Sequence, residues 1–308
     1  MNRGTRALGK PTRSTSLTTA KSELLALAPD ALGRLPTLDG PLDVLVTDGV
    51  MRTRTKSLRT HLWSGPILPG SFFPLGEGVF CTTPEFLVVQ RAQSLSLVEL
   101  IGLVMTLCAI YSFDESHSIR LCDPLTNLER IAAFIGRMPA CPGTAKAKLA
   151  VRYALERSAS PWETRMALLN TLKPAMGGYH FEKPKLNHPI QLGKQAQRMT
   201  HRRHYVCDEY WPQYKIDLEF NGAQFHDDPD QAREDARRKK VLEFMGIRVI
   251  DVRAYELASL GIYDDVARQL AHYMGKRLRV FDAKHRHARI ELRKALFADS
   301  GGHFERRG

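Results

Sequence analysis

The clearest hydrophobic pattern lies in the C-terminal half of the chain, where short alternating runs predict β-strands. A first strand is predicted over Tyr205–Tyr210, followed by a break at Trp211-Pro212 and a second strand over Tyr214–Phe220. In the second strand, apolar side chains alternate with polar ones at Lys215, Asp217, Glu219 and Asn221. Successive side chains of a strand point to opposite faces. The pattern therefore predicts a hairpin with one core face and one strongly polar face.

Helical patterns lie on both sides of this hairpin. Upstream, Ser160-Pro161-Trp162-Glu163 is typical of a capped helix start, and Pro174 is expected to end that helix. Turns are predicted at Gly177-Gly178 and Asn187-His188-Pro189. Downstream, the pattern predicts a helix over 230–245 ended by Gly246, a strand over 247–252 and a closing helix over 262–274. The order helix, hairpin, helix, strand, helix predicts an α/β sandwich.

The N-terminal half predicts a smaller, mainly helical α/β domain. A strand is expected over Leu42–Thr47, with a turn at Asp48-Gly49. Thr82 or Thr83 can cap a helix that has Pro84 in its first turn, and helices are expected over 86–92 and 95–111. The predicted organisation is a basic flexible tail over 1–22, an N-terminal domain over 23–150, the α/β sandwich over 151–275 and a basic C-terminal tail over 276–308.

Composition narrows the class of protein. The 308 residues are 43% hydrophobic, which is enough for ordinary buried cores, and that length suggests about two domains. The five cysteines are scattered, with no C-x-x-C pair, so neither a disulfide framework nor a structural zinc site is expected. The longest apolar run, residues 100–111, is shorter than the roughly twenty residues that cross a bilayer. We expect a cytoplasmic protein with no membrane partner.

Charge is concentrated at the two ends. The formal net charge is +12, from 45 basic and 33 acidic residues. Residues 1–22 contain five basic residues and no acidic one, and residues 276–308 contain ten basic and four acidic ones. Flexible basic segments bind phosphate backbones without sequence preference. The charge therefore favours a DNA partner, although the body of the chain is close to neutral.

Two acids of the predicted hairpin are the main candidates for chemistry. Asp208 and Glu219 fall near the ends of adjacent strands, and Asn221 follows two residues on. Mg²⁺ prefers one or two carboxylates, waters and a phosphate oxygen, so the pair predicts a metal site beside a phosphodiester. His226 lies just beyond and titrates near neutrality, as a proton-transferring group should.

At these residues the sequence resembles the PD-(D/E)XK nuclease-like superfamily, and within it the domains related to very-short-patch-repair endonucleases. The resemblance spans roughly residues 158–275, through S-A-S-P-W-E-T-R from Ser158, Y-V-C-D-E-Y-W-P from Tyr205, I-D-L-E-F-N-G from Ile216, F-H at 225–226, E-D-A-R-R-K-K-V-L from Glu234 and G-I-R-V-I-D-V from Gly246. It implies a restriction-endonuclease-like fold and Mg²⁺ or Mn²⁺ bound by Asp208 and Glu219.

The resemblance also assigns supporting positions. Asn221 stands where the family has a catalytic lysine, so the missing charge would come from Lys215, Arg238 or Lys239. His226 and Asp235 match recurrent family positions, and Glu163 matches an acid that sometimes joins the metal shell. The basic residues expected to contact the DNA backbone are Arg202, Arg203, Arg237, Lys239 and Lys240.

Simpler interpretations stand beside these assignments. Helix capping alone explains Glu163, and a solvated or ion-paired strand position explains Asp217. His226 also fits a structural role, and the basic run 237–240 fits a solvated helix face. The alternative to a metal-dependent DNA endonuclease is a nuclease fold without turnover that serves as a DNA-binding regulator of antitoxin type. A third interpretation is a scaffold for another partner.

The N-terminal half resembles the AbiEi class of antitoxin regulators more weakly, through V-F-C-T-T-P-E-F-L from Val79. That resemblance implies a winged-helix DNA-binding domain. A packing domain without a ligand is the alternative.

Overall fold

A computed structural model describes residues 42–52, 58–76, 79–114, 116, 118–222, 229–278 and 282–297. The chain has a mixed α/β fold and divides into two compact units. Unit 1 comprises residues 1–94 and 130–148, and unit 2 comprises residues 95–129 and 149–308. No described helix has both the length and the apolar character that a membrane span needs.

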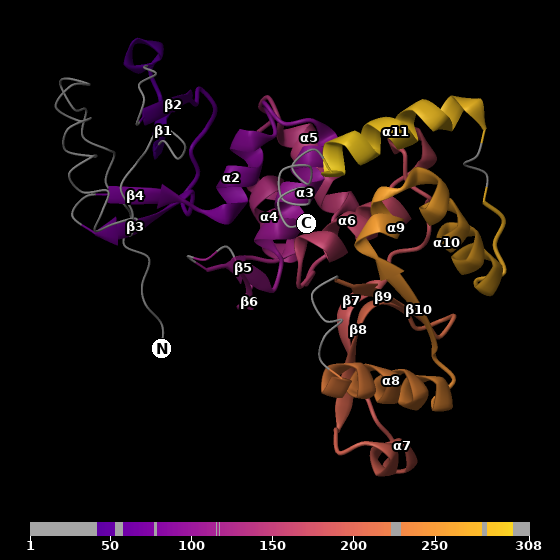
Figure 1. Ribbon diagram of the computed structural model, residues 1–308. Helices are drawn as coiled ribbons and strands as arrows, with labels where there is room; N and C mark the ends of the chain where they lie inside the picture. Colours follow the sequence, from indigo (N-terminus) through magenta and orange to yellow (C-terminus); the bar gives the residue numbers. More distant parts are fainter. Residues whose placement is uncertain are drawn as a thin grey trace. The chain divides into compact units, whose positions relative to one another are not determined.

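Unit 1 contains two small sheets and helices (Figure 1). Its strands are β1 (Leu42–Val46), parallel to β2 (Leu58–Leu62), and the hairpin β3 (Phe72–Gly76) with β4 (Val79–Thr82). Its helices are η1 (Gly49–Met51), α2 (Pro84–Arg91), most of α4 (Leu128–Arg137) and the first half of α5 (Thr144–Tyr153). The predicted strand at 42–47 is confirmed.

An aromatic cluster forms the core of unit 1. Phe86 is fully buried, with Trp63 edge-on to it at 5.2 Å between ring centroids and Phe134 at 6.1 Å. The predicted start of α2 is confirmed, because the Thr83 side chain accepts a hydrogen bond from the Phe86 amide and Pro84 occupies the first turn. The cap thus fixes the helix that carries Phe86 into the core.

Unit 2 is built on a four-stranded sheet in the order β10-β9-β8-β7 (Figure 1). Its strands are β7 (Lys185–Gln191), β8 (His204–Trp211), β9 (Ile216–Asn221) and β10 (Arg248–Arg253), with a separate hairpin of β5 (Tyr111–Phe113) and β6 (Ile119–Leu121). Strands β7, β8 and β9 are antiparallel neighbours, and β10 pairs parallel with β9. The predicted hairpin of β8 and β9 is confirmed.

Helices of unit 2 lie on both faces of this sheet. They are α3 (Leu97–Leu107), α6 (Pro161–Thr171), η2 (Pro174–Met176), α7 (Lys194–Met199), α8 (Pro229–Phe244), α9 (Ala254–Ala258), α10 (Leu260–Tyr273) and α11 (Ala283–Phe297). Phe220 of β9 stacks on Trp162 of α6 at 5.3 Å, while its neighbour Glu219 contacts Arg238 of α8. Successive strand residues point to opposite faces, so α6 and α8 cover opposite sides of β9.

This double coverage corrects one prediction. The sequence predicts a strongly polar face on the second strand with Asp217 solvated or ion-paired, and the solvated alternative is wrong, because Asp217 is fully buried and Glu219 is only 5% exposed. The reason is that α8 packs against that face, where Val241 and Leu242 join a core with Tyr205 and other residues of β7, β8 and β10. A central strand covered on both sides buries whatever its alternate positions carry.

A second correction concerns β7. The predicted turn at Asn187-His188-Pro189 lies inside this strand. Pro189 is tolerated because β7 is an edge strand, whose outward amide needs no ladder partner. Asn187 adopts a left-handed backbone conformation with φ of 45°. The local sequence pattern therefore does not predict this strand, because a proline is tolerated at the sheet edge and one residue departs from strand geometry.

The C-terminal region differs from the predicted basic tail. Residues 283–297 form α11, in which Arg289, Leu292 and Arg293 are buried. Gly177 lies so close to this helix that a side chain there would meet the Ala288 carbonyl at 2.3 Å, and its φ of 92° also favours glycine. Part of the terminal charge therefore belongs to the folded unit.

Candidate functional site

Asp208 and Glu219 lie on neighbouring strands at the point where their pairing ends. The β8–β9 ladder runs from Trp211↔Ile216 to Glu209↔Leu218 and stops there. Beyond it, Asp208 Oδ2 accepts a hydrogen bond from the Phe220 amide at 2.8 Å, so a carboxylate replaces the next backbone acceptor. Burial, then the charges of Glu219 and Glu163, raise the pKa of Asp208 well above its ordinary value. The predicted pair is thus brought together.

Glu163 joins these acids from α6. Its backbone amide donates to Ser160 Oγ at 3.1 Å, as expected of a helix cap. Its carboxylate accepts hydrogen bonds from the Ala159 amide at 2.7 Å and from Asn187 Nδ2 at 2.5 Å. Burial is the main cause of its raised pKa, and Glu219 adds to the effect. Capping therefore explains part of the position of Glu163, and its contact with β7 explains the rest.

Arg238 of α8 is the cation at the centre of this cluster. Its guanidinium donates to both carboxylate oxygens of Glu219, at 2.6 Å for the Nη1–Oε2 pair, and to the Val206 carbonyl. The same guanidinium lies 4.0 Å from Asp217 Oδ2. Burial lowers the pKa of this guanidinium, but the carboxylates of Glu219, Asp217 and Asp208 together outweigh burial and raise the pKa above its ordinary value. Arg238 is therefore the positively charged group in contact with these carboxylates.

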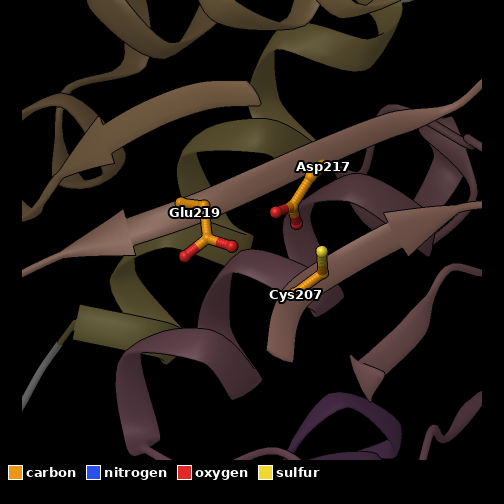
Figure 2. A group of neighbouring side chains, drawn as sticks. All are labelled: Cys207, Asp217 and Glu219. Atoms are coloured by element: carbon orange, nitrogen blue, oxygen red, sulfur yellow. The ribbon is translucent and has the colours of Figure 1, made fainter. Parts of the chain in front are cut away.

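Asp217 and Cys207 form a second, adjoining group with Glu219. Figure 2 shows the three side chains between two neighbouring strands, with the Cys207 sulfur directed toward the Asp217 carboxylate. One donor atom of each lies within 4.8 Å of the other two. Burial, followed by the influence of Glu219, raises the pKa of Asp217 well above its ordinary value, and burial followed by Asp217 raises the pKa of the Cys207 thiol.

Glu209, the residue after Asp208, belongs to a different network. Its Oε2 accepts a hydrogen bond from Asn170 Nδ2 at 2.8 Å, and Tyr263 of α10 donates to Asn170 Oδ1 at 2.9 Å. All three side chains are buried. Burial raises the pKa of Glu209 to about 8. This chain of hydrogen bonds ties α6 and α10 to β8 and gives Glu209 a structural role.

The remaining predicted residues are spread around the pair. Asn221 is exposed at the end of β9 and donates to Asp251 Oδ1 at 2.9 Å, and Lys239 pairs with the other oxygen of Asp251 at 2.6 Å. Lys215 lies in the turn before β9, at the opposite end of that strand, with φ of 51°. It is therefore not placed beside Glu219. His226 lies outside the described residues.

The predicted DNA-contacting side chains are exposed and partly ion-paired. Arg202 donates to Glu234 at 2.7 Å, and Arg237 lies 3.8 Å from the same carboxylate. Arg203 and Lys240 are exposed, as is Asp235 on α8. Arg202 thus contacts α8 through Glu234, and Arg238 of the same helix contacts Glu219 of β9.

Several residues of the site are absent from the predictions. Asn187 was assigned to a turn, Asp217 to a solvated or ion-paired strand position, and Cys207 carried no assignment. The order of elements does contain a signal for the burial of Asp217. A strand that pairs with the preceding strand in a hairpin and with the following strand through a helical connection is a central strand, and helices cover both of its faces. No sequence signal joins Asn187 to Glu163, since the contact depends on the irregular backbone of β7.

No protein family, curated protein or solved structure matches this chain in comparisons of sequence and structure. The interpretation of the site therefore rests on its own geometry.

Proposed function

We propose that this chain is a metal-dependent endonuclease-like protein that hydrolyses DNA phosphodiester bonds, with a restriction-endonuclease-like core in unit 2. The observation that carries the proposal is the placement of Asp208 and Glu219 on paired strands with Glu163 beside them. Apart from the short helices η2 and α7, the element order is α6, β7, β8, β9, α8, β10, with β10 parallel to β9, and this order also fits the proposed core.

The donor set suits a hard divalent cation such as Mg²⁺ or Mn²⁺. Carboxylate oxygens are the ligands these ions prefer, and Asp208 with Glu219 would hold one, with Glu163 as a neighbour. Burial, and after it the neighbouring carboxylates, raises the pKa values of Asp208 and Glu163, and a bound cation would favour their ionised forms. When bound, such an ion would polarise the phosphoryl oxygen and acidify a coordinated water.

Other residues of this chain would bind the substrate phosphate, orient a water and contact the DNA backbone. Arg238 neutralises Glu219 in the structure described here, and on metal binding its guanidinium is free to turn toward a substrate phosphate, which it suits geometrically. Asn221 can orient a water through its amide, although it carries no charge. Arg203, Lys240 and their basic neighbours on α8 are available for the DNA backbone.

A second candidate function has its own observation. Glu219 is held by two hydrogen bonds from Arg238, and Asn221 is engaged by Asp251, so both family positions have internal partners. A site closed in this way favours a DNA-binding protein without turnover, the regulator of antitoxin type. The two candidates share the fold and the DNA partner, and they differ in whether Arg238 releases Glu219.

Cleavage and binding measured side by side distinguish them. We expect the full chain to cleave plasmid, linear duplex or single-stranded DNA with Mg²⁺ or Mn²⁺ and not with a chelator. Glu219→Gln should lower the cleavage rate by more than about 100-fold, beyond the usual effect of losing a supporting group. The matched control is Glu209→Gln, which changes a buried acid of the same strand pair outside the proposed site. Salt-sensitive DNA binding without cleavage by the wild type would instead establish the second candidate.

A further inference from the structure

We propose that Cys207, Asp217 and Glu219 form a binding site for a thiophilic divalent cation, represented by Zn²⁺. The three donors come from β8 and β9, and their ligand atoms lie within 4.8 Å of one another (Figure 2). Cys207 and Asp217 are fully buried and Glu219 is 5% exposed. The site shares Glu219 with the proposed Mg²⁺ pair and differs from it by using the sulfur of Cys207 and the carboxylate of Asp217.

Asp217 provides an independent indication of a missing ligand. Among the described residues, no group outside the cluster donates a hydrogen bond to either carboxylate oxygen of this completely buried side chain, and the side-chain hydrogen bonds that affect its pKa come from Glu219 and Cys207, the other members of the group. The nearest cation, Arg238, is 4.0 Å away and is engaged with Glu219 and Val206. A buried polar group without partners destabilises a fold, and more strongly when it is charged. A cation between Asp217 and Cys207 would remove that cost.

The donor set selects the type of metal. Mg²⁺ and Ca²⁺ prefer oxygen ligands, whereas a cysteine with two carboxylates suits Zn²⁺ or Co²⁺. At the usual Zn–S and Zn–O lengths, donor atoms of a tetrahedral site lie about 3.3–3.6 Å apart. Donors that already lie within 4.8 Å therefore need side-chain movements of about 1 Å. Three protein ligands leave the fourth position for water.

Charge balance is also favourable. On binding, the Cys207 thiol and the protonated carboxyl group of the cluster release their protons to solvent, a sulfur–metal bond forms, and the two carboxylates donate lone pairs. The thiolate and two carboxylates carry three negative charges, which the divalent cation and Arg238 cancel. Arg238 needs to give up only part of its contact with Glu219 and can keep the Val206 carbonyl. The complete site is neutral, as a buried site should be.

Binding of Zn²⁺ by Cys207, Asp217 and Glu219 does not depend on the proposed nuclease function. One consequence does: Glu219 belongs to both groups of ligands, so Zn²⁺ at this site should inhibit Mg²⁺-dependent cleavage. Because binding is measured without DNA, failure of one proposal leaves the other open to its own test.

Cobalt substitution provides the experiment. The reduced full chain, freed of metal, is titrated with Co²⁺ and then with Zn²⁺. We expect one equivalent of Co²⁺ to give a thiolate-to-cobalt charge-transfer band, which Zn²⁺ abolishes and excess Mg²⁺ leaves unchanged. Cys207→Ala should lose the band and weaken Zn²⁺ binding at least about 100-fold, and Asp217→Asn should weaken it at least about 10-fold.

The matched control is Cys108→Ala, which removes another buried thiol of unit 2 that is not part of the Cys207, Asp217 and Glu219 group. It should bind Co²⁺ like the wild type. The proposal is overturned if the wild type shows no thiolate band at saturating Co²⁺, or if Cys207→Ala retains the band. The wild-type spectrum alone can overturn the proposal, so the test does not depend on the variants being folded.

Discussion

Two buried polar regions of unit 2 carry opposite charge. The first lies around β9 and combines carboxyl groups with one guanidinium: Glu163, Asp208, Asp217, Glu219 and Arg238. The second lies between α10 and α11 and combines two guanidinium groups with one carboxylate and a hydroxyl: Arg289, Arg293, Asp264 and Tyr179. One region is rich in acid and the other in base.

The difference between them is chemical. Buried carboxyl groups can be neutralised by a proton or by a bound cation, and the raised pKa values of Asp208 and Asp217 express that tendency. A guanidinium cannot lose its proton in a protein, so Arg289 depends on its ion pair with Asp264 and on Tyr179. An acid-rich region can therefore exchange ligands, whereas the base-rich region serves as a fixed structural contact.

Removal of Asp264 tests the structural role of the base-rich region. Tyr179 donates to Asp264 at 2.6 Å and Arg289 pairs with it, so Asp264→Ala leaves a buried cation without its carboxylate. We expect a loss of about 3–5 kcal/mol in the free energy of unfolding, nearly equal at pH 5.5 and pH 8.5. Urea denaturation provides the measurement. The adjacent control, Asp265→Ala, removes an exposed pair with Arg268 and should cost no more than about 1 kcal/mol.

Removal of Arg238 tests the acid-rich region. Arg238→Ala should lower the free energy of unfolding by about 3–4 kcal/mol at pH 8.5, because Glu219 loses its buried partner. Arg238 lowers the pKa of Asp208, so its loss raises that pKa further and the native state binds still more protons than the unfolded chain. The deficit should therefore shrink as the pH falls toward 5.5.

Lys239→Ala is the control on the same helix, since it removes an exposed pair with Asp251 and should cost about 0–1 kcal/mol. If the loss of unfolding free energy in Arg238→Ala were the same at pH 5.5 and pH 8.5, the acid-rich region would respond to pH like the base-rich region. That result would contradict the proposed difference between them.

Of the three substitutions, Glu209→Gln has the smallest expected effect on the free energy of unfolding. It also tests whether stability changes with pH in the predicted direction. Its pKa is raised by burial to about 8, so the folded state holds its proton where the unfolded chain has released it. The resulting contribution to stability is present below about pH 4.5 and is lost as the pH rises toward 8. Glu209→Gln should therefore reduce the fall in unfolding free energy between pH 5 and pH 8 by about 3 kcal/mol. Thermal or urea unfolding across that range measures it, and an unchanged slope would assign the pH dependence to other groups.

Local sequence signals account for the elements that carry the predicted acids. Alternation and the Trp211-Pro212 break indicated β8 and β9, and the Ser160 cap indicated α6, because each signal acts within a few residues. Burial of Asp217 depends on α8 folding over the sheet, which no local pattern contains. The basic run on α8 likewise appeared solvated, yet Arg238 reaches Glu219, nineteen residues away in the chain.

The central claim is that the acids of β8 and β9 are arranged to bind a divalent cation used in DNA cleavage. The most direct measurement is anomalous scattering from a crystal of the full chain soaked in Mn²⁺. The account predicts a manganese peak within bonding distance of Asp208 and Glu219, with Glu219 released by Arg238. A structure in which Arg238 still holds both oxygens of Glu219, with no peak at Asp208, would contradict it.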